Sequence, residues 1–383
     1  MSPLSPELIV STLPPRAICL SLLALLALGA CDRPEAAGPV IARDSAGVRI
    51  LEISVPAGQA PLEAIPVAAP AADTVAWYQV TELAWLAEDA FVALNRGTME
   101  LVWVELDGAV RRIGGEGEGP GEFRMPIGVS VGPDGRVHVI DRRNRTWSVF
   151  DRQGALVSTE ALDNLPPISY VRQAGIRGDE RAIVAEAGFA FPRGAQGIYD
   201  DSLTFFVVHR SGEPLDTAFN VFWLQHDRQP DRTSAVWPAA STDYAVGPDA
   251  IFAAPGNSSD IQRRAVDGTL EGLIRFPEAV AVWPPTAPEG QLFVQRLLVA
   301  DDEGRLWTHR FADPADAAEE RWVVVDPIGE RLVGVVMLPE GFTLRAVRGN
   351  RLIGVLRDEL DVEHVRVLGV RGLGDPAGAG GGV

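Results

Sequence analysis

Short stretches of alternating apolar and polar residues recur along most of this chain, bounded by glycine, proline, asparagine or aspartate. The clearest example is Gly114–Gly154. Within it, the apolar run Ile127–Val131 ends at Gly132–Gly135, whose sequence GPDG is typical of a tight hairpin turn. Arg136–Ile140 then alternates with the period of a β-strand. The stretch predicts a glycine-rich loop, three short strands, and a turn that leads into a fourth strand.

This unit recurs along the chain. The first full repeat, Leu83–Ile113, overlays the second without a gap when shifted by 46 residues. Later copies are less regular, and the third contains a long insertion at Ala187–Asp201. The four later copies are centred on Ile183–His209, Tyr244–Gly268, Leu297–Gly329 and Phe342–Val370.

The sixth copy lacks a fourth strand, and the N-terminal segment has a spare strand pattern at Val48–Ile53. A four-stranded meander cannot bury both of its faces alone, so the copies must pack against one another. Closing the set with the N-terminal strand leaves only short edges. The sequence therefore predicts an all-β fold, a six-bladed β-propeller in which Val48–Ile53 completes the last blade.

The N-terminus has the pattern of an export signal. Ala17–Gly29 is an apolar run preceded by Arg16, too short to span a bilayer and typical of a secretory signal peptide. Leu28–Cys31 resembles the bacterial lipobox, in which the cysteine is diacylated and becomes the mature N-terminus. An ordinary signal peptide is the alternative; we favour lipidation of Cys31 because the chain has only 2 cysteines. Asp32 favours the inner membrane, on the rule that enterobacterial lipoproteins follow.

The expected organisation is a signal peptide at 1–30, a tether at 31–46, the propeller at 47–372 and a disordered tail at 373–383. The net charge of −18 argues against nucleic acid as a partner of the folded part. Removal of the signal would also remove Cys19 and leave no pair of thiols for a disulfide.

One family resemblance rests on the second repeat. Gly121–Phe123, Pro126–Val129, Gly135–Asp141 and Val149–Asp151 resemble an NHL repeat. The whole chain is similar to the six-bladed β-propeller lipoproteins of environmental Gram-negative bacteria, in the TolB-like propeller group. The resemblance implies a fold and a place in the cell envelope, but it implies no reaction.

Three motifs that suggest catalysis have a simpler explanation here. The sequence around Ser130 matches the G-x-S-x-G pattern of serine hydrolases, but that motif works on a strand-to-helix elbow and Ser130 lies within a predicted meander. The glycine-rich loop lacks the lysine of a phosphate-binding loop. The 5 histidines show no metal-binding spacing, so we expect no zinc site.

Propeller ligands usually bind at one end, the mouth, which is lined by the loop leading into each innermost strand and the loop joining the second and third strands. The repeat register places an arginine-rich rim there, able to hold a carboxylate or a sugar acid. The alternative interpretation is that these arginines are solvated charges on surface loops and bind no ligand. Calcium is a weaker option, through Asp141, Asp260 and Asp358. The candidate rim residues are Asn95, Arg96, Arg124, Asp141, Arg142, Arg143, Asn144, Asn257, Asp260, His309, Arg310, Arg357 and Asp358.

These observations predict a membrane-tethered envelope module that binds a protein, peptide or glycan and catalyses no reaction, with no required cofactor. The alternative is a metal-dependent propeller enzyme, lactonase-like or lyase-like, acting at the central channel. Scaffolding of an envelope assembly differs from the first hypothesis only in the partner.

Overall fold

The computed structural model describes residues 38–163, 171–177, 181–188, 196–210, 216–235, 242–277, 296–310 and 320–373. The chain divides into two compact units, Met1–Gly38 and Pro39–Val383, and every element described below belongs to the second. The expected signal peptide and Cys31 lie outside the described residues, as does nearly all of the expected tail. The described part is almost entirely β-strand.

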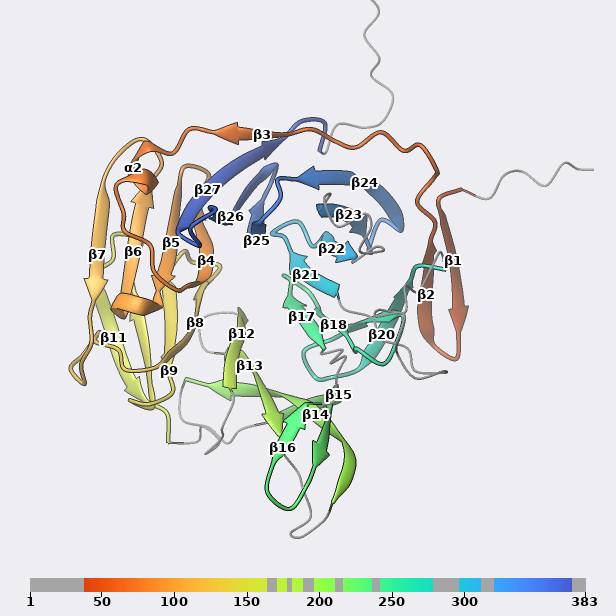
Figure 1. Ribbon diagram of the computed structural model, residues 1–383, viewed down its shortest axis with the longest axis horizontal. Helices are drawn as coiled ribbons and strands as arrows, with labels where there is room; N and C mark the ends of the chain where they lie inside the picture. The colour runs from red at the N-terminus through yellow and green to blue at the C-terminus, as the bar shows by residue number, and fades with distance from the viewer. Residues whose placement is uncertain are drawn as a thin grey trace, which may run out of the picture. The chain divides into compact units, whose positions relative to one another are not determined.

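Sheets 1 and 2 are the two most regular repeats, and each has four antiparallel strands in sequence order (Figure 1). Sheet 1 contains β4 (Val80–Ala87), β5 (Ala90–Asn95), β6 (Glu100–Glu105) and β7 (Val110–Gly114). Sheet 2 contains β8 (Pro126–Val131), β9 (Val137–Asp141), β10 (Thr146–Phe150) and β11 (Leu156–Ala161). The turn between β8 and β9 closes with Gly135 at φ 77°, a left-handed conformation that glycine adopts without strain. The predicted meander is confirmed, and Ser130 lies inside β8.

The later repeats form four more sheets. Sheet 3 contains β12 (Val171–Arg177), β13 (Arg181–Gly188), β14 (Gly197–His209), β15 (Asp216–Arg228) and β16 (Thr233–Ala235). Sheet 4 contains β17 (Asp243–Val246), β18 (Ile251–Ala254), β19 (Asp260–Arg264) and β20 (Leu270–Arg275), extended by β2 (Val48–Ile53) and β1 (Val40–Ser45). Sheet 5 contains β21 (Arg296–Ala300), β22 (Leu306–Arg310), β23 (Glu320–Asp326) and β24 (Arg331–Leu338). Sheet 6 contains β25 (Phe342–Arg348), β26 (Arg351–Arg357), β27 (Glu363–Val370) and β3 (Ala64–Val67).

The first strands of the sheets contact one another in order, β4 to β8, β12, β17, β21 and β25, and β25 contacts β4 again. Each neighbouring pair of sheets shares a cluster of buried apolar side chains. Trp103 and Trp147, on third strands, are 2% and 0% exposed and lie in two of these clusters, where they pack between repeats. The core is therefore divided among the interfaces between sheets.

The predicted position of the N-terminal strand is wrong. Val48–Ile53 (β2) pairs in parallel with β20 of sheet 4 and not with the sixth repeat. The strand that completes sheet 6 is β3, Ala64–Val67, which pairs antiparallel with β27. Pro66 cannot donate a backbone hydrogen bond, which restricts its strand to an edge, and β3 occupies an edge. The N-terminal segment does close the last sheet, but through Ala64–Val67 and not through the predicted Val48–Ile53.

The rest of this segment is also structured. The predicted tether extends to residue 46, but Val40–Ser45 within it forms strand β1, the antiparallel partner of β2. The backbone N–H of Leu62 donates to the carbonyl of Val335 in sheet 5 at 2.7 Å. A single helical turn, α2 (Pro70–Asp73), follows β3 and packs in the cluster between sheets 6 and 1. Residues 40–73 thus contact sheets 4, 5, 6 and 1 in turn.

Candidate functional site

The mouth is the end at which the first strands begin, the second strands end and the third strands begin. In sheet 2 it is organised by Asp141, the last residue of β9, which is 1% exposed. One carboxylate oxygen accepts the backbone N–H groups of Arg124 and Met125 at 2.7 and 2.9 Å, and the other accepts that of Asn144 at 2.7 Å. Asp141 therefore fixes both mouth loops of its sheet and turns its oxygens toward the backbone.

Asn95 occupies the corresponding position in sheet 1 and is 0% exposed. Its side-chain oxygen accepts the backbone N–H of Tyr78 at 2.8 Å, and its amide nitrogen donates to the carbonyl of Ala76 at 3.2 Å. The same device recurs in the two best repeats, because an amide or carboxylate at the end of the second strand reaches the loop before the first strand. Two predicted rim residues thus have structural partners.

The glycine-rich loop between β7 and β8 is held at the same end. The side-chain amide of Asn144 donates to the carbonyls of Gly117 and Glu122, at 2.9 and 3.3 Å. Arg124 forms an ion pair with Glu118. The loop therefore connects sheets 1 and 2, as predicted, and lies over the mouth of sheet 2.

The arginines of sheets 1 and 2 differ in their surroundings. Arg96 opens the short 3-10 helix η1 (Arg96–Thr98) and is exposed, and Arg143 is exposed in the loop after β9. Arg142 is half-buried and donates to the sulfur of Met125 at 3.7 Å. The structure therefore leaves Arg96 and Arg143 exposed at the mouth ends of two adjacent sheets, whereas Asn95 and Asp141 face inward.

In sheet 5 the predicted rim residue His309 is buried, 7% exposed, and packs on Trp322 with ring centroids 5.5 Å apart. Burial lowers the pKa of its imidazole. This corrects the expectation of a rim position, because β22 continues through His309 to Arg310 and holds the imidazole in the core. The side chain of Arg310 lies outside the described residues.

The mouth loop of sheet 6 is a network of ion pairs. Arg357 contacts Asp361 at 3.0 Å and Glu363 at 2.8 Å, and these carboxylates raise the pKa of its guanidinium. Glu363 also accepts the backbone N–H of Val80 at 2.8 Å, which ties sheet 6 to the first strand of sheet 1. Asp358 lies 3.1 Å from His364, and this hydrogen bond lowers the pKa of the carboxyl group. Arg357 is thus already neutralised by its own loop.

The two candidates of sheet 4 behave differently. Asn257 is exposed in the loop between β18 and β19. Asp260 accepts both Nε and Nη2 of Arg275, at 2.8 and 2.7 Å, and this pairing raises the pKa of the guanidinium. The three aspartates considered for calcium, Asp141, Asp260 and Asp358, are each engaged within their own sheet.

Sequence reasoning missed two features of the mouth end. Tyr78, in the loop that leads into β4, is 59% exposed, and the loop rule that selected the arginines could have selected it too. In sheet 3 the long hairpin of β14 and β15 buries Asp201 against Nδ1 of His226. Burial raises the pKa of the Asp201 carboxyl, although the hydrogen bond from His226 opposes this. The insertion at Ala187–Asp201, where it is described, includes the first part of that hairpin.

Within the ranges that the structure describes, no three histidine, cysteine, aspartate or glutamate side chains gather in a group able to hold a metal ion. In the same ranges, no helix has the length and apolar character needed to cross a membrane.

No protein-family profile and no curated protein matches this sequence. Among solved structures, the chain is similar to a member of the DUF4221 family from Bacteroides vulgatus, with 9% identity, a TM-score of 0.53, and coverage of 82% of this chain and 96% of that one. It is also similar to a gluconolactonase from Xanthomonas campestris, with 15% identity, a TM-score of 0.44, and coverage of 82% and 99%. A virginiamycin B lyase variant from Staphylococcus aureus gives 12% identity, a TM-score of 0.41, and coverage of 80% and 99%. These are propeller-like proteins, and the likeness concerns the fold alone.

Proposed function

We propose that this chain is a six-bladed β-propeller of the NHL-like, TolB-like kind, tethered by a lipid on Cys31 to the periplasmic side of a bacterial membrane. Six sheets whose first strands contact one another in a closed cycle support the blade count. The lipobox-like residues support the anchor, and Asp32 favours the inner membrane. Two or more acyl chains give firm attachment without a transmembrane helix.

The function that the geometry supports best is binding, without catalysis, of a carboxylate-bearing peptide, protein or glycan at the mouth. The observation that carries this proposal is the contrast between the exposed Arg96 and Arg143 and the inward-facing Asp141. A guanidinium recognises a carboxylate through paired, charge-assisted hydrogen bonds. An acidic protein that exposes arginines at one end is suited to an anionic group there, because the inward-facing Asn95 and Asp141 are already hydrogen-bonded to backbone groups.

The test is binding of an acidic peptide and of oligogalacturonate to the full-length protein in detergent, measured by calorimetry. We expect the double variant Arg96→Gln, Arg143→Gln to weaken binding by about tenfold or more, since each charged hydrogen bond contributes roughly 1.5 kcal/mol or more. Arg331→Gln is the matched control, because Arg331 is an exposed arginine at the opposite end of sheet 5. Equal loss in both variants would overturn the mouth as the site. Turnover of a lactone or ester by the wild type would overturn the exclusion of catalysis and restore the enzyme alternative.

A further inference from the structure

Tyr78 is an exposed aromatic residue whose backbone is held in place. Its N–H donates to Asn95 at 2.8 Å, and its carbonyl accepts the N–H of Gly97 at 2.9 Å. The carbonyl of Gln79 accepts the N–H of Arg96 at 3.2 Å, and Gln79 has φ 55°, an unusual conformation for a residue with a side chain. The loop before β4 is thus joined by two hydrogen bonds to helix η1 and by one to Asn95 at the end of β5. Such a loop presents its side chain at little further entropic cost.

Gly97 provides the support for the Tyr78 ring. A Cβ atom at position 97 would lie 2.0 Å from Cδ1 and 2.6 Å from Cγ of Tyr78, so no residue other than glycine fits there without moving the ring. One side of the ring therefore packs against the backbone of η1. The side chain is nevertheless 59% exposed, which leaves most of its remaining surface to solvent. An aromatic ring backed by glycine and open on its other side is a platform for a flat apolar surface.

Arg96 lies beside this platform. It precedes Gly97 in η1, it is exposed, and its backbone is bonded to the residue that follows Tyr78. The aromatic ring and the guanidinium thus project from two loops that are hydrogen-bonded to each other. A ligand that satisfies both must offer an apolar face and a negative charge close to each other.

We infer that Tyr78 and Arg96 form a subsite for a uronic acid residue of an acidic glycan. A uronic acid carries a flat C–H face and a carboxylate on one sugar ring, so a single residue can cover Tyr78 and pair with Arg96. An acidic peptide would need an apolar and an acidic side chain from two residues in a fixed arrangement. The inference rests on the proposed function, the binding of a carboxylate-bearing ligand at the mouth, and it specifies the class of that ligand.

The experiment is calorimetric titration of the full-length protein in detergent with oligogalacturonate and with a neutral galactose oligomer of equal length. We expect Tyr78→Ala to weaken oligogalacturonate binding by about tenfold, while Tyr78→Phe keeps the ring and stays within about threefold of the wild type. Arg96→Gln should reduce the preference for the acidic over the neutral oligomer, which is a readout that a folding defect would not produce.

Leu360, in the mouth loop of sheet 6, is an apolar residue that is 84% exposed. A protein partner bound at the mouth would cover such a side chain, whereas a uronic acid bound at Tyr78 and Arg96 does not need it. Leu360→Ser should leave oligogalacturonate binding unchanged. The inference is overturned if Tyr78→Ala binds oligogalacturonate as the wild type does. It is equally overturned if the wild type binds an acidic peptide through Arg96 and Arg143 but no uronate oligomer, and in that case the proposed function stands. If the wild type binds neither the acidic peptide nor oligogalacturonate, both this inference and the proposed function are overturned.

Discussion

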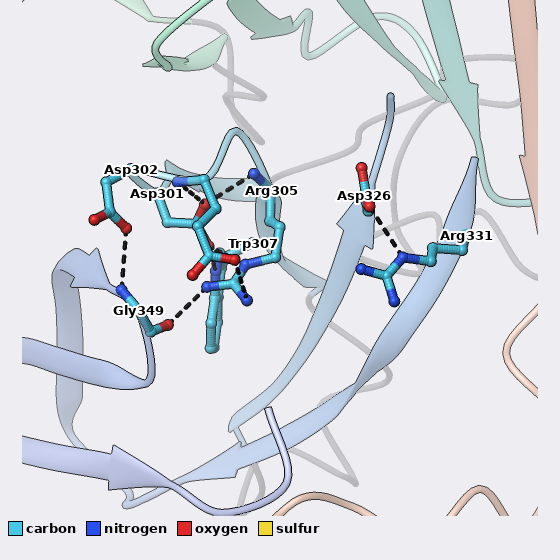
Figure 2. Close-up of polar contacts among 8 residues, drawn as sticks. Asp301, Asp302, Arg305, Trp307, Asp326, Arg331 and Gly349 are labelled. Atoms are coloured by element: carbon cyan, nitrogen blue, oxygen red, sulfur yellow. Dashed lines mark hydrogen bonds and ion pairs between the residues drawn. The ribbon is translucent and has the colours of Figure 1, made fainter. Parts of the chain in front are cut away.

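Two turns of sheet 5 each carry an aspartate–arginine pair, and the two pairs differ in burial (Figure 2). In the turn between β21 and β22, the side chains of Asp301 and Arg305 are 0% and 5% exposed, and Arg305 Nε donates to Asp301 at 2.6 Å. In the turn between β23 and β24, those of Asp326 and Arg331 are 21% and 60% exposed, and Arg331 Nε donates at 3.0 Å. The same two residue types thus meet in a dry and in a wet environment within one sheet.

The buried pair also has more partners. Asp301 accepts the indole N–H of Trp307 at 2.9 Å and the backbone N–H groups of residues 303 and 305. Arg305 Nη2 donates to the carbonyl of Gly349 in sheet 6 at 2.7 Å, and Asp302 accepts the N–H of Gly349 at 3.0 Å. The exposed pair lies within its own turn, where Asp326 also accepts the N–H of Gly329 at 2.7 Å.

The comparison teaches that the distance between two opposite charges does not by itself tell how much the pair stabilises the fold; the burial of the pair must also be known. A pair in water contributes about 0–1 kcal/mol, because solvent screens the attraction and two side chains must be ordered. Breaking a buried pair costs about 3–5 kcal/mol, because the remaining charge has no water to replace its partner. We therefore expect sheet 5 to depend on Asp301 for its junction with sheet 6 and to tolerate change at Asp326.

The largest effect is expected for Asp301→Asn. The substitution removes the buried one of the two carboxylates paired with Arg305, since Glu303 is half exposed, and places an N–H₂ group or a weaker acceptor before two donors. We therefore expect a loss of about 3 kcal/mol in the free energy of unfolding. Urea denaturation followed by tryptophan fluorescence measures it. The matched control is Asp326→Asn in the same sheet. A shift of equal size in the two variants would contradict the role given to burial.

A double substitution tests whether the unpaired charge of Arg305 causes the loss of stability in Asp301→Asn. Asp301→Leu combined with Arg305→Met replaces both partners by apolar side chains and should recover part of the stability lost in Asp301→Asn, because no unpaired charge remains buried. A double variant as unstable as the single one would mean that the hydrogen bonds to the backbone of the turn, and not the ion pair, hold the junction.

An intermediate effect is expected from His309, a buried ionisable group of the same sheet that packs on Trp322. Burial lowers its pKa from the ordinary 6.5, so the unfolded chain binds a proton at a higher pH than the folded one. The free energy of unfolding should therefore fall as the pH drops below 6.5 toward the folded pKa, by at most about 1.4 kcal/mol per pH unit. His309→Asn should flatten this part of the curve of stability against pH. An unchanged slope in His309→Asn would assign the dependence to another group.

Much of the fold could be predicted from the sequence because each repeat encodes its own meander. Alternation and the turn at Gly132–Gly135 depend only on neighbouring residues, and they place the strands of the second repeat correctly. The position of Val48–Ile53 could not be predicted in this way. It has a stronger strand pattern than Ala64–Val67, but the pairing partner of an edge strand depends on how far the chain can reach. Ala64–Val67, which is nearer to β4 in the sequence, pairs with the last sheet, and Val48–Ile53 pairs with sheet 4.

The mouth could be predicted less fully, since the register gives the position of a side chain but not its partner. Asp141 and Arg143 are two residues apart in the sequence, and one is buried against backbone N–H groups while the other is exposed. The register predicts His309 at the rim, but β22 continues past it and keeps its imidazole in the core. Tyr78 has no repeat signal, and its role depends on the space that Gly97 leaves. These distinctions arise from contacts between residues far apart in the sequence: Tyr78 and Asn95 are 17 positions apart, Met125 and Asp141 are 16 apart, and His309 and Trp322 are 13 apart.

The smallest effect is expected for Asp326→Asn, and its dependence on pH sharpens the contrast with Asp301. Partial burial opposes ionisation of Asp326, but the hydrogen bonds from the backbone of Gly329 and from Arg331 outweigh it, and the folded pKa lies below the ordinary 3.8. A carboxyl group with a lowered pKa stabilises the fold above pH 3.8, and this contribution is lost as the pH falls through the folded pKa. At pH 7 the variant should be less stable by no more than about 1 kcal/mol, and the difference from the wild type should shrink below pH 3.8. A constant difference across this range would mean that Asp326 acts through the shape of the turn and not through its charge, and the burial of Asp301 would no longer explain why the two turns differ.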